Sequence, residues 1–194
     1  MMTKICLVRH GETDWNVQGR LQGKTDIPLN ETGIQQAKLC AHYFHSANWD
    51  LIVTSPLIRA RKTAEIINEP LQLSMIVLDH FTEKGFGYAE GLTIEEKREQ
   101  FPTNEVPNME SPELLRKRLK QGIEIIQKNY SEQNIILVAH GAVINALLAI
   151  FSENIIGTGK TSLANASLST ILYSENKWNI EDFNQINHLN EKIH

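Results

Sequence analysis

Short apolar runs alternate with amphipathic stretches along most of the chain, and this alternation strongly limits the folds available to it. Each run has the length of a buried strand and is followed, directly or after a loop, by a stretch with helical periodicity. The runs before residue 141 are residues 4–8, 51–53, 74–78 and 134–139. Strands that alternate with helices pair in parallel, because each helix returns the chain to the same end of the sheet. The sequence therefore predicts an α/β fold, a three-layer α/β/α sandwich with a largely parallel central sheet.

Capping residues mark where the predicted helices begin. Asn30 is expected to cap a helix that carries an apolar stripe. The stripe consists of Ile34, Ala37, Ala41 and Phe44. Ser55-Pro56 and Ser111-Pro112 each place a serine at the N-cap and a proline at the first helical position. We expect the helix after Ser111 to end near Tyr130, and a further apolar helix to cover residues 142–151.

The end of the chain predicts two more strands, residues 168–173 and 178–183, joined by a turn at Glu175-Asn176. Residues 11–29 and 79–91 are predicted to be loops, and loops of such length are usually functional. The 194 residues fit one domain, so we expect residues 1–194 to fold as a single domain.

Cationic and imidazole side chains follow the carboxyl ends of three predicted strands. Arg9-His10 ends the first run, His140-Gly141 ends the run at 134–139, and Ser55 follows the run at 51–53 with Arg59 soon after it. In parallel sheets, ligands bind outside the carboxyl ends of the strands. We therefore expect these groups to converge on one rim of the sheet.

Composition narrows the class of ligand and the compartment. The formal net charge is −4, which argues against a nucleic-acid partner, although a local cluster of Arg and His suits a small anion. No apolar stretch of about 18 residues or signal peptide is present, so we expect no membrane span and a cytoplasmic protein. Cys6 and Cys40 are expected to be reduced core thiols. The remaining histidines are expected at the surface, without a metal site. These are His42, His45, His80, His188 and His194.

The residue types at the rim suit a phosphomonoester. Arg9 and Arg59 offer two planar forks for phosphate oxygens, and the helix starts after Ser55 and Gly141 add N–H groups. His140 adds a donor, and a second positive charge if protonated. A neutral histidine, His10, is able to act as a nucleophile when its other ring nitrogen donates to a carbonyl in the Gly11 turn. The leaving alkoxide then requires a carboxylic acid from a nearby loop.

Four segments resemble blocks of the histidine phosphatase superfamily, also called the phosphoglycerate mutase-like family. The first is Leu7 to Thr13 with Asn16 and Gln22-Gly23, the second Ser55 to Ala64, the third Glu83 to Gly91 and the last Val138 to Gly141. The resemblance runs from about residue 4 to residue 183, in the family's order. It implies a phosphoglycerate mutase-like fold, and the overall pattern is most similar to the broad-specificity phosphatase branch.

The resemblance also implies a role for each matching residue. His10 would attack phosphorus and become phosphohistidine, and Glu83 would protonate the leaving oxygen and then activate water. The phosphate would be bound by Arg9, Asn16, Gln22, Gly23, Arg59, His140 and Gly141. Neither a metal nor another cofactor is expected, and the partner is a small phosphorylated substrate. Ala89 departs from the family pattern, in which tryptophan is frequent at this position.

Two alternatives remain beside a phosphatase. A cofactor-dependent phosphoglycerate mutase shares the nucleophile, but the short segment between Glu83 and His140 favours the phosphatase. So does the Lys-Gly-Phe-Gly that follows Glu83. A non-catalytic phosphoanion-binding module would require loss of a catalytic residue, and none is lost. Glu90 and Asp79 are the other candidate acids in the loop. The sequence does not indicate the physiological substrate, and no apolar stripe indicates an oligomer.

Overall fold

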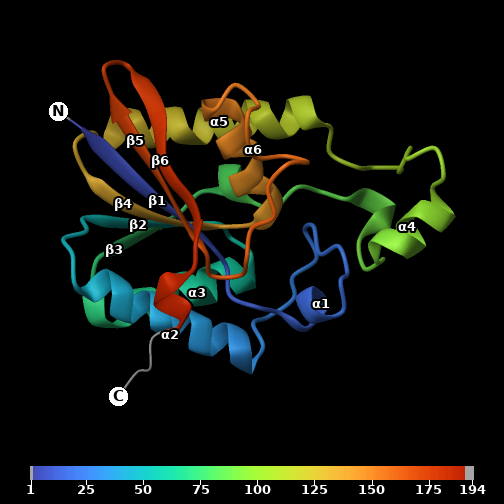
Figure 1. Ribbon diagram of the computed structural model, residues 1–194, viewed down its shortest axis with the longest axis horizontal. Coiled ribbons are helices and arrows are strands. Elements are labelled where there is room, and N and C mark those ends of the chain that lie inside the picture. Colours follow the sequence, from blue (N-terminus) through green and yellow to red (C-terminus); the bar gives the residue numbers. More distant parts are fainter. Residues whose placement is uncertain (1, 191–194) are drawn as a thin grey trace.

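The computed structural model describes residues 2–190, whose six strands form one sheet in the order β3-β2-β4-β1-β5-β6 (Figure 1). The strands are β1 (Thr3–Arg9), β2 (Leu51–Thr54), β3 (Ser74–Val77), β4 (Asn134–Ala139), β5 (Leu168–Ser174) and β6 (Lys177–Gln185). β1, β2, β3 and β4 are parallel, whereas β5 pairs antiparallel with both β1 and β6. The prediction of an α/β fold with a largely parallel sheet is therefore confirmed.

Helices cover both faces of the sheet, as the three-layer prediction requires (Figure 1). The α-helices are α1 (Asp14–Val17), α2 (Glu31–His45), α3 (Ile58–Leu71), α4 (Ile94–Gln100), α5 (Pro112–Asn129) and α6 (Gly141–Phe151). The 3-10 helices are η1 (Asp79–Phe81), η2 (Gly87–Ala89) and η3 (Asn187–Asn190). One apolar cluster lies between the sheet and α5 and α6, and a second lies between the sheet and α2 and α3.

The central strand β1 explains why its sequence is a continuous apolar run. Ile5 and Leu7 belong to the cluster under α5 and α6, while Cys6 and Val8 belong to the cluster under α2 and α3. Successive side chains of a strand point to opposite faces, so a strand covered on both faces is apolar throughout. Burial of this kind contributes about 25 cal/mol for each Å² of apolar surface removed from water.

Two of the three predicted helix caps are confirmed, and one is wrong. Asn30 Oδ1 accepts from Gly33 N at 2.8 Å, and Ser111 Oγ accepts from Leu114 N at 3.2 Å. The helix expected from Ser55-Pro56 instead begins at Ile58, after an N-cap residue that makes no side-chain cap bond. Ser55 Oγ contacts a histidine ring, and the N–H of Ile58 donates to Asp26 Oδ1 at 2.7 Å. A carboxylate from a distant loop therefore replaces the expected local cap.

The two predicted loops contain short helices, and α4 was not predicted. α1 interrupts residues 11–29, and η1 and η2 interrupt residues 79–91. α4 lies away from the sheet in Figure 1 and has no buried residue, so no apolar stripe marked it in the sequence. Its signal was the Thr93-x-x-Glu96 capping box, in which each side chain bonds the other residue's N–H.

The hairpin between β5 and β6 turns at Glu175-Asn176, as predicted. Both residues have positive φ, 52° and 61°, as a two-residue type I′ turn requires. None of the helices within residues 2–190 combines the length and apolar character needed to cross a bilayer.

The expectation for Cys6 and Cys40 is confirmed, but that for His188 is wrong. Both cysteines are buried and neither forms a disulfide, and burial raises the pKa of the Cys6 thiol to about 12. His188 is only 3% exposed because η3 packs against α2, where its Nε2 lies 3.0 Å from Ala166 O and 3.4 Å from Cys40 Sγ. His194 lies outside the described residues.

Candidate active site

The order of the strands brings the predicted rim residues together. β4 lies between β1 and β2, so His10 after β1, His140 after β4 and Ser55 after β2 follow three adjacent parallel strands. The ring centroids of His10 and His140 are 5.3 Å apart. Arg9 is the last residue of β1, and Arg59 lies in the first turn of α3.

The His10 ring is buried and held in one orientation. The residue is 2% exposed, and Nδ1 lies 2.7 Å from Gly11 O. Since a carbonyl only accepts, Nδ1 carries the proton and Nε2 holds a lone pair. Burial lowers the pKa of His10 well below its ordinary value of 6.5, and the charges of Arg59 and Arg9 lower it further. The ring is therefore neutral near neutral pH, with Nε2 as a nucleophilic atom.

Gly11 is required by close packing against the start of α2. A Cβ at this position would overlap the carbonyl oxygen of Gly33, and a Cβ at Gly33 would overlap Glu12 O. The N–H of Gly11 donates to Thr63 Oγ1 at 3.1 Å, which ties the turn to α3. The residue whose carbonyl orients His10 is thus held by packing against the Gly33 backbone and by a hydrogen bond to the Thr63 side chain.

The two arginines are buried and bind carbonyl oxygens. Arg59 is fully buried, and its two terminal nitrogens donate to Thr25 O at 2.9 Å and to Gly23 O at 2.7 Å. Arg9 Nη1 donates to Leu163 O. Carbonyls orient a guanidinium without neutralising it, and burial lowers the pKa of both groups because it disfavours the charged form. Positive charge is therefore concentrated beside His10.

His140 is also neutral, which changes one expectation. Burial lowers the pKa of His140 well below its ordinary value, and Arg59, His10 and Arg9 lower it further. Its Nε2 lies 2.7 Å from Ser55 Oγ, which also accepts from Leu57 N at 3.3 Å. When the hydroxyl donates to Nε2, the proton of the ring sits on Nδ1. His140 thus offers a neutral N–H donor, and the second positive charge that we considered is absent.

Several buried polar atoms at this rim have no partner. Of seven buried side-chain atoms without a hydrogen bond in residues 2–190, four belong to predicted site residues. They are Arg9 Nε, Arg59 Nε, His140 Nδ1 and Gln22 Oε1. An unpaired buried donor costs about 1–3 kcal/mol, so three donors at one place favour a ligand that supplies acceptor oxygens.

Glu83 is 8% exposed, and its carboxyl lies at the N-terminus of α6. Oε1 accepts from Lys84 N at 2.8 Å and from Val143 N at 3.3 Å, and Oε2 accepts from Ala142 N at 3.2 Å. Burial raises the pKa of Glu83 above its ordinary value, although these N–H groups and the charges of Arg59 and Arg9 oppose the shift. The protonated form is thereby favoured, as a general acid requires.

Glu90, another candidate acid, has a different place. Its carboxylate accepts from Lys24 N, Thr25 N, Thr25 Oγ1 and Phe86 N at 2.7–3.1 Å. Glu90 therefore links two segments. One carries Gly23 and Thr25, whose carbonyls bind Arg59, and the other is the loop that carries Glu83. Gly23, at φ 54°, lies so close that a Cβ would overlap the Glu90 carboxylate. The remaining candidate, Asp79, is exposed.

Asn16 is oriented by a residue that the sequence analysis missed. Asn16 Oδ1 accepts from Thr13 N and from Asn165 Nδ2, each at 3.1 Å, which leaves its amide nitrogen to donate elsewhere. Asn165 Nδ2 also donates to His10 O at 3.1 Å. Asn165 lies just before β5, 149 positions from Asn16, and no motif pointed to it.

A cavity of about 670 Å³ lies beside Glu83. It is mainly apolar, with two cationic side chains, and its lining includes Lys84 and Ala142, whose N–H groups bind the Glu83 carboxyl. The other lining residues are Phe86, Ile94, Pro112, Leu115, Arg116, Asn145, Ala146, Asn154, Thr158 and Gly159. A molecule that contacts Glu83 thus has room for a further group on this side.

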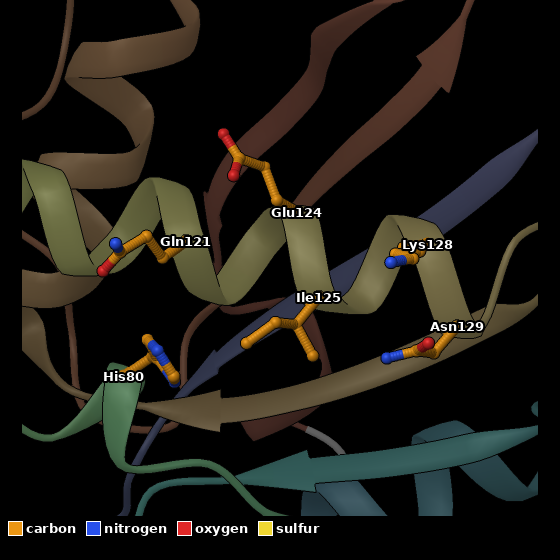
Figure 2. A pocket seen from close by; sticks show the side chains of 6 residues that line it. All are labelled: His80, Gln121, Glu124, Ile125, Lys128 and Asn129. Carbon is orange, nitrogen blue, oxygen red and sulfur yellow. The ribbon is translucent and has the colours of Figure 1, made fainter.

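A second hollow of about 500 Å³ lies along α5, away from these residues (Figure 2). It is lined by His80, Gln121, Glu124, Ile125, Lys128 and Asn129, and it includes none of the predicted site residues. Within residues 2–190, no group of three His, Cys, Asp or Glu side chains is arranged to hold a metal ion.

Known proteins are similar to this chain in sequence and in architecture. A sequence profile of the Histidine phosphatase superfamily (branch 1) matches residues 5–186. The chain is 50% identical over 188 residues to the "Uncharacterized phosphatase PhoE" of Bacillus subtilis (strain 168), covering 97% of each chain. It is 33% identical over 189 residues to the "Probable phosphoglycerate mutase GpmB" of Photorhabdus laumondii, covering 91% of this chain and 88% of that one.

Among solved structures, phosphoserine phosphatase from Entamoeba histolytica in complex with 3-phosphoglyceric acid matches with a TM-score of 0.85. The two sequences are 32% identical, and the match covers 96% of this chain and 99% of that chain. The expected phosphoglycerate mutase-like fold is thereby confirmed.

Proposed function

The chain belongs to branch 1 of the histidine phosphatase superfamily, and on this premise we propose that it hydrolyses small phosphomonoesters through a phosphohistidine on His10. Glu83 is the general acid and then the general base, and no metal ion takes part. The observation that carries the proposal is the neutral His10 ring. Its Nδ1 is tied to Gly11 O, which leaves the lone pair on Nε2, and the charges of Arg59 and Arg9 act on the same ring.

The substrate phosphate supplies what the unpaired donors lack. A phosphomonoester carries about −1.5 to −2 charge near pH 7 and presents three acceptor oxygens. Arg9, Arg59 and the Nδ1–H of His140 bind these oxygens, and each has a buried donor without a protein partner. The Asn16 amide and the Gly23 N–H add donors from the loop after β1. Stabilising the charge in place is most of what phosphoryl transfer requires.

The first step transfers the phosphoryl group to the enzyme. Nε2 of His10 forms a bond to phosphorus while the bond from phosphorus to the alcohol oxygen breaks. That oxygen takes the proton of the Glu83 carboxyl, whose pKa is raised by burial in favour of the protonated form. The Nδ1–H of His10 stays bonded to Gly11 O and stabilises the positive charge of the phosphorylated ring. The alcohol occupies the cavity beside Lys84 and Ala142.

The second step returns the enzyme to its first state. The Glu83 carboxylate takes a proton from water, and the water oxygen attacks phosphorus. The bond between phosphorus and Nε2 breaks, its electron pair returns to the ring, and inorganic phosphate leaves. Each proton and each bond is thereby restored, so that the step needs neither a metal nor a cofactor.

Replacing the nucleophile tests this proposal. His10→Ala should lower the turnover of phenyl phosphate on the order of 10³-fold or more, because only binding and charge stabilisation remain. His42→Ala, at an exposed position of α2, is the control and should retain full activity. Labelled substrate, quenched in alkali, should leave a phosphoryl group on the protein that acid removes. Near-normal turnover without His10, failure to trap such an adduct, or strong inhibition by a chelator would overturn the mechanism.

A phosphoglycerate mutase is the second candidate, since a probable mutase is among the relatives. In a mutase, the phosphohistidine returns its phosphoryl group to a bound acceptor instead of to water. A panel of phosphomonoesters, with and without 2,3-bisphosphoglycerate, distinguishes the two reactions. Phosphate release without isomerisation of phosphoglycerate supports the phosphatase, and isomerisation that exceeds release supports the mutase.

A further inference from the structure

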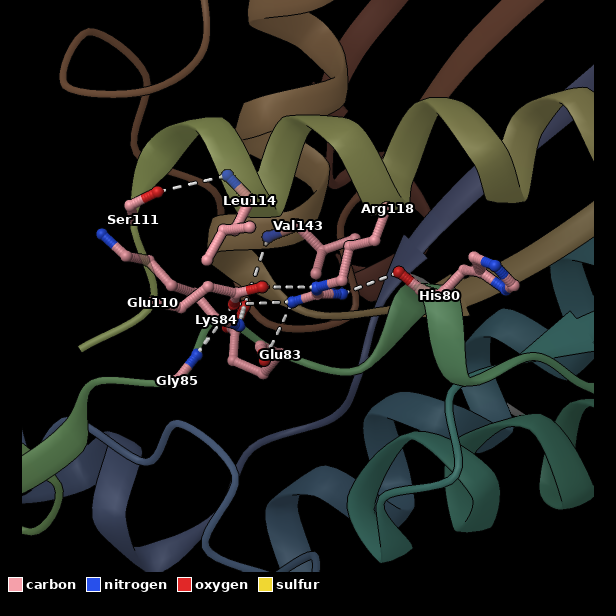
Figure 3. A network of polar contacts seen from close by, with 9 residues as sticks. All are labelled: His80, Glu83, Lys84, Gly85, Glu110, Ser111, Leu114, Arg118 and Val143. Atoms are coloured by element: carbon pink, nitrogen blue, oxygen red, sulfur yellow. Dashed lines mark hydrogen bonds and ion pairs between the residues drawn. The ribbon is translucent and has the colours of Figure 1, made fainter. Parts of the chain in front are cut away.

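An ion pair outside the predicted site forms hydrogen bonds with the loop that carries Glu83 (Figure 3). Arg118, on α5, donates from Nε to Glu110 Oε1 at 2.6 Å and from Nη2 to Glu110 Oε2 at 3.0 Å. The two side chains are 19% and 12% exposed. Paired, parallel bonds of this kind fix the orientation of the guanidinium as well as its position. We call these two side chains the Arg118–Glu110 clamp.

The clamp binds backbone groups at three residues, Glu83 and Gly85 in the acid loop and His80 in η1. Arg118 Nη1 donates to His80 O at 2.7 Å, and Nη2 donates to the carbonyl of Glu83 itself at 3.2 Å. Glu110 Oε2 accepts from Gly85 N at 3.1 Å, and the Glu110 N–H donates to Gly85 O at 2.8 Å. Figure 3 shows the Arg118 guanidinium between the Glu110 carboxylate and the carbonyls of His80 and Glu83.

The loop needs such support because it lacks regular structure. Residues 82–86, between η1 and η2, are neither helical nor part of the sheet. Their backbone groups therefore have no ladder partners, and Glu83 O and Gly85 N bind the side chains of the clamp instead. A partly buried pair that also binds the backbone of three residues does more than join two surface charges, because exposed ion pairs by themselves contribute little to stability.

We propose that Arg118 and Glu110 are positioning residues that set where the Glu83 carboxyl meets the leaving-group oxygen. α6 orients the carboxyl through the N–H groups of Ala142 and Val143, and the clamp fixes the backbone from which that carboxyl extends. Neither clamp residue touches the reacting atoms in this role. The inference rests on the proposed function, because it requires Glu83 to be the acid.

Proton donation is sensitive to such a shift, since a displacement of about 1 Å costs on the order of 10²-fold in rate. Arg118→Gln should therefore lower kcat/KM for phenyl phosphate on the order of 10- to 100-fold. For dinitrophenyl phosphate, whose leaving group needs little proton donation, the loss should be small. kcat/KM is the appropriate quantity because it includes no step after formation of the phosphoenzyme. Arg61→Gln breaks an exposed ion pair on α3 and is the matched control, with no expected change.

A double variant separates positioning from a general structural role. Once Glu83→Gln has removed the acid, adding Arg118→Gln should change kcat/KM by no more than about twofold. The positioning role alone is overturned if Arg118→Gln lowers kcat/KM equally for both esters. It is also overturned if the losses of the two substitutions multiply in the double variant. If Glu83→Gln is itself equally slow with both esters, the acid assignment fails and the clamp fails with it.

Thermal unfolding accompanies every variant, so that loss of the fold is not mistaken for loss of positioning. If Arg118→Gln does not fold, Glu110→Gln replaces it, because this variant keeps the bonds of Arg118 to the carbonyls of His80 and Glu83 and weakens the pair and its contact with Gly85 N. The same dependence on the leaving group is expected from Glu110→Gln, and its absence would overturn the proposal.

Discussion

Glu83→Gln is the substitution that most directly tests the chemistry, because it keeps the shape of the side chain and removes its proton. General acid catalysis is worth about 10²–10⁴-fold. We expect kcat/KM for phenyl phosphate to fall by about that factor, and kcat/KM for dinitrophenyl phosphate to fall by at most about tenfold. The ratio of the two losses measures proton donation, since binding of the phosphate is common to both esters.

The stability of this variant follows from its hydrogen bonds. The amide oxygen of the glutamine accepts from Lys84 N and Val143 N in place of Oε1, and the NH₂ group then faces Ala142 N. One buried N–H thereby loses its acceptor, which costs about 1–3 kcal/mol. At this chain length each kcal/mol lowers Tm by about 2–4 °C, so we expect a decrease of about 2–12 °C. Assays at temperatures well below the lowered Tm then compare folded proteins.

Asp79→Asn is the matched control, because Asp79 is an exposed carboxylate that precedes the same loop. It should leave both esters unaffected. Steady-state kinetics over a series of aryl phosphates, together with calorimetric unfolding, provides both measurements. Losses that are equal across the series, or a dependence on the leaving group that appears with Asp79→Asn, would refute the assignment of Glu83.

Three further outcomes are expected. The plot of kcat/KM against pH should rise through a pKa below 6.5 as His10 loses its proton and fall through a pKa above 4.5 as Glu83 loses its own. Glu83→Gln should abolish the falling limb, and a retained limb would contradict this. Gly11→Ala should cost about 1–3 kcal/mol in urea unfolding, because its Cβ would overlap a backbone oxygen of α2. Phe44→Ala should lower the free energy of unfolding by about 3–5 kcal/mol. Tyr43→Ala, at the exposed neighbouring position, should lower it far less.

Local patterns in the sequence were sufficient for the architecture of the sheet and its helices. Strand length, helical periodicity and the caps Asn30 and Ser111 each depend on residues within a few positions of one another. The rim that joins His10 and His140 was also predictable, because parallel strands end at the same edge of a sheet. The role of Ser55 was not, since its hydroxyl bonds a ring 85 positions away instead of capping the adjacent helix.

By itself, the sequence determined the layers of the fold, the residue that we propose as the nucleophile and the family to which the chain belongs. Only the tertiary structure decided which groups support the reacting residues. Asn165 reaches Asn16 across 149 positions, Glu90 reaches Thr25 across 65, and Arg118 reaches Glu83 across 35. The physical reason is that hydrogen bonds and burial act between neighbours in space. A periodicity or motif describes only neighbours along the chain, so partners such as these emerge when the sheet has brought the loops together.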